Sequence, residues 1–216
     1  MIRIIKRVAT GIILGLLFWQ IFIYYPPVYF SCLLLGILLV IIIFEWRRLF
    51  NLRQPTFWLL MPLYPIMPFV CMISMNHSLE YRPLLFILFM IVFAHDTGSY
   101  IFGSLFGKHA VYPLVSPGKT WEGFAGGYLA ACISLFILFW GNNNNKPWWF
   151  LLCLTLLVCT LSLCGDLFES WLKRRVDIKD SGTLLPGHGG FLDRFDGAMF
   201  VAVFFYIFRA YLVAIF

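Results

Sequence analysis

Residues 84–106 read LLFILFMIVFAHDTGSYIFGSLF, an apolar stretch interrupted by one aspartate and long enough to cross a bilayer as a helix. A membrane-spanning helix needs about 20 mostly apolar residues. The remaining sequence has the same character, since 62% of the 216 residues are hydrophobic, 12% are charged and the mean hydropathy is +0.88. This composition leaves no room for a large soluble domain. It predicts an all-α, polytopic integral membrane protein.

We predict about seven transmembrane helices, at residues 8–25, 28–44, 57–75, 84–106, 123–140, 148–168 and 197–216. Three prolines, at positions 62, 65 and 68, are expected to kink the third helix. The first apolar run follows a basic start, as in a signal peptide, but the YYPP sequence at 24–27 offers no small-residue cleavage site. We therefore predict a retained anchor. Residues 1–90 form the predicted N-terminal anchor helices, and residues 91–216 form the predicted second part, a membrane domain with cytoplasmic loops that carries nearly all of the polar chemistry.

The basic residues are divided unequally between the two sides of the membrane. With the N-terminus inside, 13 of the 16 Lys and Arg fall on the inner side, and only Arg82 and Lys146 fall in outer loops. The positive-inside rule then places the loops after the second, fourth and sixth helices in the cytoplasm. We expect a bacterial inner-membrane protein. The six cysteines all lie in apolar spans without a C-x-x-C pair, which favours core residues over disulfides or a zinc site.

Asp96 is the ionisable residue within the fourth span, beside His95 and toward the inner end. An ionisable side chain at that depth is costly and is usually functional. The alternative is a structural aspartate whose carboxylate is satisfied by the hydroxyl of Thr97 or Ser99.

A second polar cluster, SPGKTWEGFAGG, occupies residues 116–127. Its GKT resembles the end of a P-loop, but position 113 holds proline where that motif requires glycine. We instead predict that Ser116, Lys119 and Thr120 bind phosphate near the start of the fifth helix, where free N–H groups point outward. Glu122, in the first helical turn, is expected to complement the helix dipole, and the glycine pair 126–127 to allow close helix packing.

The third cluster lies between the sixth and seventh spans. Asp166 and Glu169 share one face of a helix, and Asp193 and Asp196 point the same way on the next helix. Asp166, Asp193 and Asp196 thus offer three carboxylates for a divalent cation such as Mg²⁺, which favours oxygen ligands and shares its coordination with substrate phosphates. The alternative is an ordinary ion pair between Asp193 and Arg194, with Asp196 in solvent.

Residues 170–196, SWLKRRVDIKDSGTLLPGHGGFLDRFD, closely resemble the signature of the phosphatidate cytidylyltransferases. Its parts are supplied here by Ser170, Lys173-Arg174, Lys179-Asp180, His188-Gly189-Gly190 and Asp193-Arg194-Phe195-Asp196. Further matches are DTGSY at 96–100, SPGKTWEG at 116–123 and GDLFES at 165–170. The family usually has a second lysine where this chain has Gly118. The resemblance covers residues 91–216, approximately.

The resemblance implies a reaction in which the phosphate of phosphatidic acid attacks the α-phosphorus of CTP, so that CDP-diacylglycerol forms and pyrophosphate leaves. It implies catalytic roles for Asp166, Asp193, Lys173, Arg194 and His188, where His188 contacts phosphate, orients an aspartate or caps a helix. Substrate or phosphate binding is implied for Ser116, Lys119, Thr120, Ser170, Arg174, Lys179, Gly189, Gly190 and Asp96. Metal binding is implied for Asp166, Asp193 and Asp196. The implied cofactor is Mg²⁺, with a second metal or a monovalent cation left open.

The implied partners are CTP, phosphatidic acid and membrane lipids, with a homodimer expected by analogy and no nucleic acid. A related enzyme that acts on another lipid is the nearest alternative, either a CTP-dependent polyprenol kinase or an ether-lipid cytidylyltransferase. An ion-coupled transporter would suit an intramembrane aspartate, but such carriers often contain internal repeats and midplane sites, and the polar groups here gather at one side instead.

Overall fold

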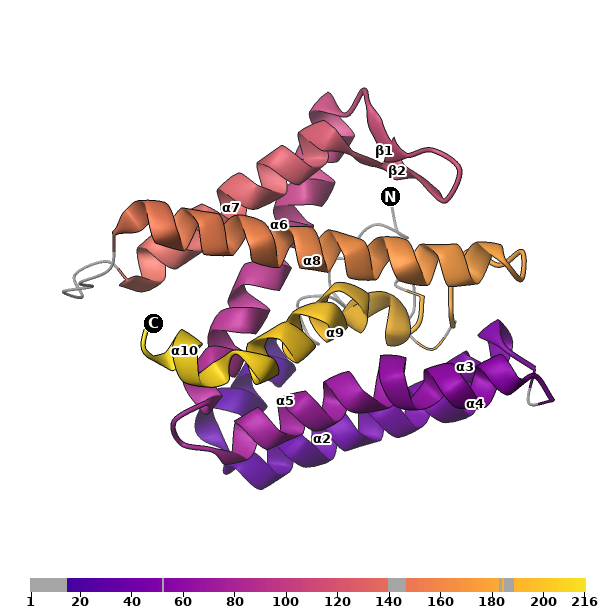
Figure 1. Ribbon diagram of the computed structural model, residues 1–216, viewed down its shortest axis with the longest axis horizontal. Helices are drawn as coiled ribbons and strands as arrows, with labels where there is room; N and C mark the ends of the chain where they lie inside the picture. The colour runs from indigo at the N-terminus through magenta and orange to yellow at the C-terminus, as the bar shows by residue number, and fades with distance from the viewer. Residues whose placement is uncertain (1–14, 52, 140–146, 183, 185–188) are drawn as a thin grey trace.

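The computed structural model describes residues 15–216 except 52, 140–146, 183 and 185–188. Over these residues the regular secondary structure is helical apart from one short β-hairpin (Figure 1). The helices are long and apolar, which confirms the predicted all-α polytopic membrane class. The division into an anchor part and a catalytic part stays a prediction, although contacts described below cross it.

The N-terminal helices are interrupted by two π-helical segments. After a short helix at Gly15–Tyr24, one apolar run consists of α2 (Pro27–Val40), the π-helical η1 (Ile41–Glu45) and α3 (Trp46–Leu49). The next run consists of α4 (Pro55–Met61), η2 (Pro62–Ile66) and α5 (Met67–His77). The proline-rich part of this second run coincides with η2, because proline lacks the N–H that the regular helical ladder requires.

Helices α6 (Arg82–Phe106) and α7 (Trp121–Phe139) pack closely and are joined by the hairpin of β1 (Ala110–Tyr112) and β2 (Ser116–Thr120). A Cβ atom on Gly98 would lie 3.0 Å from the carbonyl oxygen of Gly126, and one on Gly127 would lie 2.5 Å from that of His95. The glycine pair thus has the packing role expected of it. The hairpin itself was not predicted, because an exposed strand of Ser, Pro, Gly, Lys and Thr has no alternating apolar pattern.

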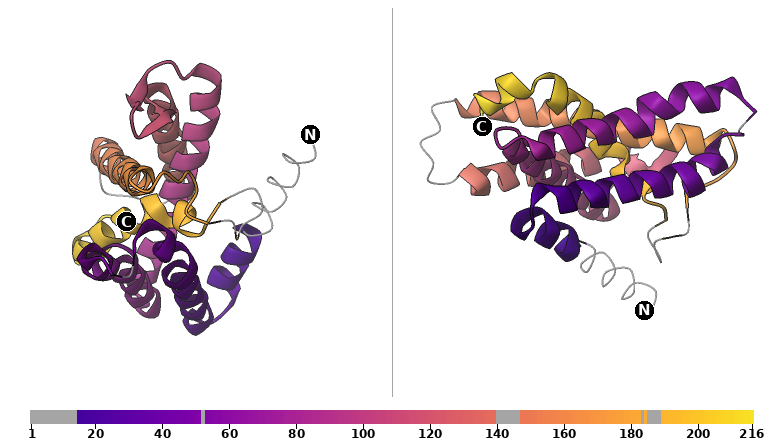
Figure 2. Two further views of the ribbon diagram at one scale, coloured as in Figure 1. Left: turned by 90° about the vertical axis from the view of Figure 1, so that its right-hand side faces the viewer. Right: turned by 90° about the horizontal axis from the view of Figure 1, so that it is seen from below.

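The last helices are α8 (Trp148–Arg174), α9 (Leu192–Ile207) and α10 (Arg209–Val213). Figures 1 and 2 show α7 on one side of α8 and α9 and α2 and α5 on the other, while in Figure 1 α6 begins beside α5 and passes behind α8 and α9 to reach α7. Aromatic rings fill the space between these layers. The ring centroid of Phe195 in α9 lies 5.3 Å from that of Phe69 and 6.4 Å from that of Phe89. The start of α9 is therefore set within the core.

Five described helices are long and apolar enough to cross a membrane, namely Pro27–Leu49, Pro55–His77, Arg82–Phe106, Trp121–Phe139 and Trp148–Arg174. The predicted first span lies partly outside the described residues. The predicted last span, 197–216, is divided between α9 and α10, which are 16 and 5 residues long. The total of seven spans therefore stays a prediction.

Candidate active site

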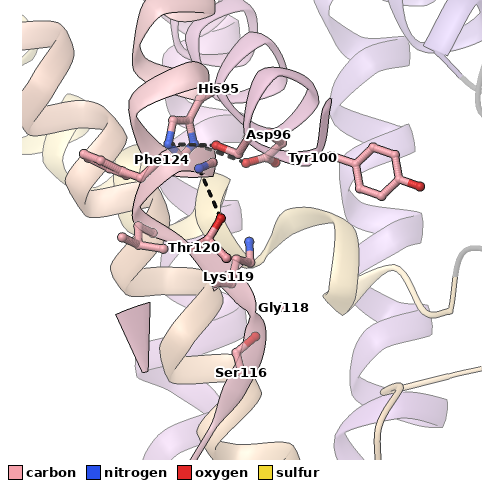
Figure 3. Close-up of a pocket in the computed structure, with 11 residues that line it drawn as sticks. His95, Asp96, Tyr100, Ser116, Gly118, Lys119, Thr120 and Phe124 are labelled. Atoms are coloured by element: carbon pink, nitrogen blue, oxygen red, sulfur yellow. Dashed lines mark hydrogen bonds and ion pairs between the residues drawn. The ribbon is translucent and has the colours of Figure 1, made fainter. Parts of the chain in front are cut away.

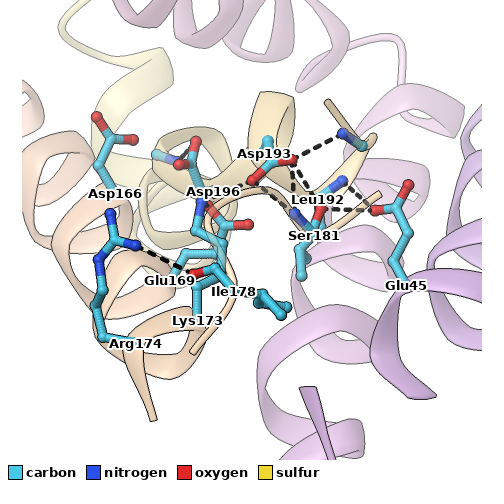
Figure 4. A network of polar contacts seen from close by, with 12 residues as sticks. Glu45, Asp166, Glu169, Lys173, Arg174, Ile178, Ser181, Leu192, Asp193 and Asp196 are labelled. Atoms are coloured by element: carbon cyan, nitrogen blue, oxygen red, sulfur yellow. Dashed lines mark hydrogen bonds and ion pairs between the residues drawn. The ribbon is translucent and has the colours of Figure 1, made fainter. Parts of the chain in front are cut away.

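The predicted carboxylates meet at one end of the helical layers, where α8 ends and α9 begins (Figure 4). Lys173 of α8 lies between two of them, with its Nζ 2.9 Å from Oε2 of Glu169 and 2.6 Å from Oδ1 of Asp193. A second lysine, Lys119 at the end of β2, forms an ion pair with Asp166. Three elements, β2, α8 and α9, thus bring acids and lysines into one cluster.

Two glycines allow α8 and α9 to cross at this level. A Cβ atom on Gly165 would lie 2.4 Å from the carbonyl oxygen of Asp196, and one on Gly197 would lie 3.1 Å from Oδ1 of Asp166. Larger residues at either position would separate the two helices. The close crossing brings Asp166 against Asp196, as the spacing of acids in the sequence predicted.

Asp193 is held by donors from its own loop. Its Oδ2 accepts the N–H of Gly190 at 2.8 Å, and the N–H and Oγ–H of Ser181 at 3.0 and 2.9 Å. Burial favours the protonated carboxyl, but the Lys173 ammonium and the Gly190 N–H outweigh it and hold the pKa of Asp193 below its ordinary value. Asp193 is therefore a carboxylate. The Nζ atom of Lys173 lies 2.6 Å from its Oδ1 and is a cation partner of Asp193.

Glu169 and Asp196 are neighbouring acids with incomplete partners. The charge of Glu169 acts on Asp196 within this cluster, and two neighbouring carboxylates have no hydrogen to share. Glu169 Oε1 is buried and has no hydrogen-bond partner among the described residues. A site of this kind needs a proton or a cation between the two acids.

A cavity of about 270 Å³ opens beside this cluster, between α6, α7 and β2 (Figure 3). Its lining includes Asp96 and Tyr100 of α6, Ser116 and Lys119 of β2, and Phe124 of α7. Desolvation favours the neutral amine of Lys119, but the neighbouring acids outweigh it and raise the pKa of this lysine above its ordinary value. The Lys119 side chain is 35% exposed, so a fixed positive charge is offered at the wall of the cavity.

Asp96 faces this cavity, and the hydroxyl partners considered for it are not engaged with it. The Ser99 hydroxyl lies 3.4 Å from Nε2 of the buried His95. The Asp96 Oδ1 atom is buried and, within the described part of the chain, has no hydrogen-bond partner. The Nδ1 atom of the His95 ring lies 3.4 Å from the same oxygen. The functional role of Asp96 stays a prediction.

Other predicted phosphate-binding residues have structural contacts. The Thr120 hydroxyl accepts the N–H of Gly123 at 3.1 Å and so caps the start of α7. Arg174 donates to the carbonyl oxygens of Val115 and Ile178, both at 3.2 Å. Arg174 thereby joins the hairpin turn to the loop after α8. Thr120 lines the cavity, and phosphate binding by either residue stays a prediction.

Glu122 does more than complement the dipole of α7. It lies in the first turn, as predicted, and it also accepts the N–H groups of Lys108 and His109 at 3.1 and 3.2 Å. Its Oε1 is 2.6 Å from Nδ1 of His109. Glu122 therefore holds the entry to the hairpin against the start of α7.

The structure does not bring every predicted residue into the cluster. Lys179 and Arg194 are exposed, and Ser170 is partly buried on α8. Gly189 has a φ of +81°, a conformation that favours glycine, and a Cβ atom there would lie 2.6 Å from Oδ2 of Asp193. His188 lies outside the described residues.

Two acids in the site were missed or undervalued. Glu169 was placed on the correct face but received no role. Glu45 was not singled out at all, yet its buried side chain accepts the N–H groups of Phe191 and Leu192 at 2.8 and 2.7 Å. The available signal was an acid at the end of an apolar run, which the adjacent Arg47 and Arg48 made look like an ordinary membrane boundary.

The donor set fits Mg²⁺ in its chemistry. Carboxylate oxygens are the ligands that this ion prefers, and Asp166, Glu169 and Asp196 belong to one cluster in which Oε1 of Glu169 has no hydrogen-bond partner among the described residues. Among the described residues, no three acids, histidines or cysteines are already arranged as a metal-binding group. The Lys119 and Lys173 ammonium groups are bound to the acids instead. The two oxygens of Asp193 are engaged by protein donors, so its role as a ligand stays a prediction.

Comparison with known proteins assigns most of the chain to one family. Residues 52–212 match the cytidylyltransferase family. A phosphatidate cytidylyltransferase of Staphylococcus haemolyticus is 46% identical over 113 residues, which are 52% of this chain and 44% of the relative. Phosphatidate cytidylyltransferases of Staphylococcus epidermidis and Staphylococcus aureus are 47% and 46% identical over 113 residues, again 44% of each relative. The matches thus span a little under half the length of these relatives.

Proposed function

Because this chain belongs to the cytidylyltransferase family, we propose that it transfers the cytidylyl group of CTP to phosphatidic acid and releases pyrophosphate. The observation that carries the proposal is the cluster of acids and lysines at the end of α8 and α9, beside a cavity with Lys119 in its wall. The names of the relatives support the choice of substrates.

The attacking phosphate of the lipid is already anionic, so alignment and charge neutralisation matter more than a general base. Lys119 presents its positive charge at the cavity wall, where a phosphate oxygen would be held. The proposed role of Lys173 is structural. Because it is bound to Glu169 and Asp193, it fixes the acids of α8 and α9 rather than a substrate.

We propose Mg²⁺ as the cofactor, held by Asp166 and Asp196 with Glu169 beside them. When bound, it would neutralise substrate phosphates and stabilise the departing pyrophosphate. Asp193 then acts mainly through its contacts with Lys173 and Ser181, which keep the start of α9 in place.

We also propose that the site faces the cytoplasm of a bacterial inner membrane. The phosphatidic acid head group would reach it from the inner leaflet, and CTP would reach it from solution. The excess of basic residues on this side supports the orientation.

Purified protein in micelles, supplied with labelled CTP, phosphatidic acid and Mg²⁺, is expected to form CDP-diacylglycerol and equimolar pyrophosphate. The Asp166→Asn variant, which removes a carboxylate charge at the crossing of α8 and α9, is expected to lose activity by at least tenfold. Release of CDP together with a phosphorylated lipid would identify a kinase instead. Uptake of a solute into vesicles without nucleotide would favour a transporter.

A further inference from the structure

Glu45 connects the N-terminal helices to the loop that carries the site (Figure 4). It is the last residue of η1, and its side chain is fully buried. Its two carboxylate oxygens accept the N–H groups of Phe191 and Leu192 separately, at 2.8 and 2.7 Å. These amides open α9, where backbone N–H groups have no partner within the helix. Glu45 therefore caps α9 although Phe191 is 146 residues away in the sequence.

Two described glycines that precede α9, Gly182 and Gly190, lie against this carboxylate. A Cβ atom on Gly190 would lie 2.7 Å from Oε1 of Glu45, and one on Gly182 would lie 3.0 Å from the same oxygen. A side chain at Gly190 would displace the acid. These two glycines thus bring the backbone close to a carboxylate of the chain itself.

Ser181 lies between Glu45 and Asp193 and contacts both. Its hydroxyl lies 3.3 Å from Oε2 of Glu45 and 2.9 Å from Oδ2 of Asp193. A hydroxyl has one hydrogen and donates to one acceptor at a time, and when it donates to Glu45 the backbone of Ser181 still binds Asp193. The N–H of Ser181 also donates to Asp193, at 3.0 Å. Glu45, Ser181 and Asp193 thus form a continuous chain of contacts.

The backbone that carries Glu45 is also unusual, because Glu45 ends a π-helical segment. A π-helical turn contains more residues than an α-helical turn and changes the direction in which the following side chain points, and such turns occur often at functional sites. A buried acid in a membrane helix is also costly unless it is hydrogen-bonded. A π-helical turn and a buried, hydrogen-bonded acid are both expected at a residue that has a functional role.

We propose that Glu45 is a positioning residue for cytidylyl transfer. Its carboxylate holds the first turn of α9, and through Ser181 it sets Asp193 against Lys173 and Asp196 against Asp166. The effect on turnover rests on the proposed function. The effect on the order of residues 189–196 does not.

The Glu45→Gln variant tests this inference, because glutamine has nearly the same shape but only one of its two terminal atoms accepts a hydrogen bond. The N–H of either Phe191 or Leu192 would then face the NH₂ group of the glutamine, which is itself a donor. We expect faster hydrogen exchange of the backbone amides in residues 189–196. We also expect turnover per folded protein to fall roughly 10-fold to 100-fold, as for other groups that orient the ligands of a site. Glu80→Gln, the same change at an exposed acid, should leave both quantities unchanged.

Ser181→Ala provides a second variant, since it removes one hydroxyl and leaves Glu45 to cap α9. We expect a smaller loss of turnover. The losses of the Glu45→Gln and Ser181→Ala variants should not add in the double variant, because the two residues share one chain of contacts. Additive losses would contradict the connection through Ser181.

The Mg²⁺ concentration for half-maximal turnover separates positioning from simple destabilisation. It should rise in Glu45→Gln if the acids of α9 are displaced, whereas a loss of folded protein alone would leave it unchanged. An unchanged value together with wild-type exchange of residues 189–196 would overturn the inference. If wild-type protein forms no CDP-lipid but exchange still rises in Glu45→Gln, the proposed function fails and the capping of α9 stands.

Discussion

Lys173 shows how one residue holds the acids of two helices. Its side chain is only 11% exposed and contacts Glu169 of α8 and Asp193 of α9. Removing one partner from a buried charged group is far more damaging than replacing the whole set with apolar residues, because the remaining charges lose their compensation. The sequence predicted Lys173 as catalytic through resemblance. The contacts assign it the more general task of keeping α8 and α9 in register.

The Lys173→Met variant is expected to lower the free energy of unfolding by about 3–5 kcal/mol, since two buried carboxylates would lose their cation. Lys179→Met is the matched control, because Lys179 is an exposed lysine of the following loop, and its effect should stay within about 0.5 kcal/mol. Denaturant unfolding in micelles measures both. Equal stability of the two variants would contradict the structural role of Lys173.

At the scale of the elements, the decisive contact is the crossing of α8 and α9. It depends on Gly165 and Gly197, whose missing side chains let backbone meet backbone beside Asp166 and Asp196. In membranes, helices associate through such small residues rather than through a hydrophobic driving force. The geometry of the acids is therefore a consequence of helix packing.

We expect Gly165→Ala to separate the two helices, with a loss of about 1–3 kcal/mol of stability and a marked loss of turnover. Gly36→Ala makes the same change in α2, where a Cβ atom would meet nothing within 4 Å. Because alanine favours helix by about 1 kcal/mol over glycine, this control should be as stable as the wild type or more so. Thermal unfolding and the CDP-lipid assay provide the measurements, and wild-type turnover in Gly165→Ala would refute the importance of the crossing.

At the scale of the whole molecule, the chain turns collect at two opposite ends. Figure 1 shows the α5–α6 turn and the C-terminus at one end, and the β-hairpin and the turn after α8 at the other. The site and most of the described basic residues belong to the second end. This arrangement is the one that the unequal division of Lys and Arg predicted.

The orientation can be tested by labelling with a membrane-impermeant maleimide in a background whose six cysteines are replaced by serine or alanine. Glu80→Cys, in the turn between α5 and α6, should react in intact cells. Lys179→Cys, in the loop after α8, should react only after the membrane is opened. Reaction of Lys179→Cys in intact cells would place the site on the outer side and contradict our proposal.

The sequence by itself determined the membrane class, the main apolar helices, the expected orientation and the family signature, because apolar runs, charge counts and local spacing are properties of neighbouring residues. It also predicted that Asp166 and Asp196 would meet. Only the tertiary structure decided that Lys119 pairs with Asp166, that a β-hairpin precedes α7 and that Glu45 caps α9. Lys119 and Asp166 are 47 positions apart in the sequence, and Glu45 and Leu192 are 147 positions apart. No local sequence pattern encodes such contacts, because they depend on how whole helices pack.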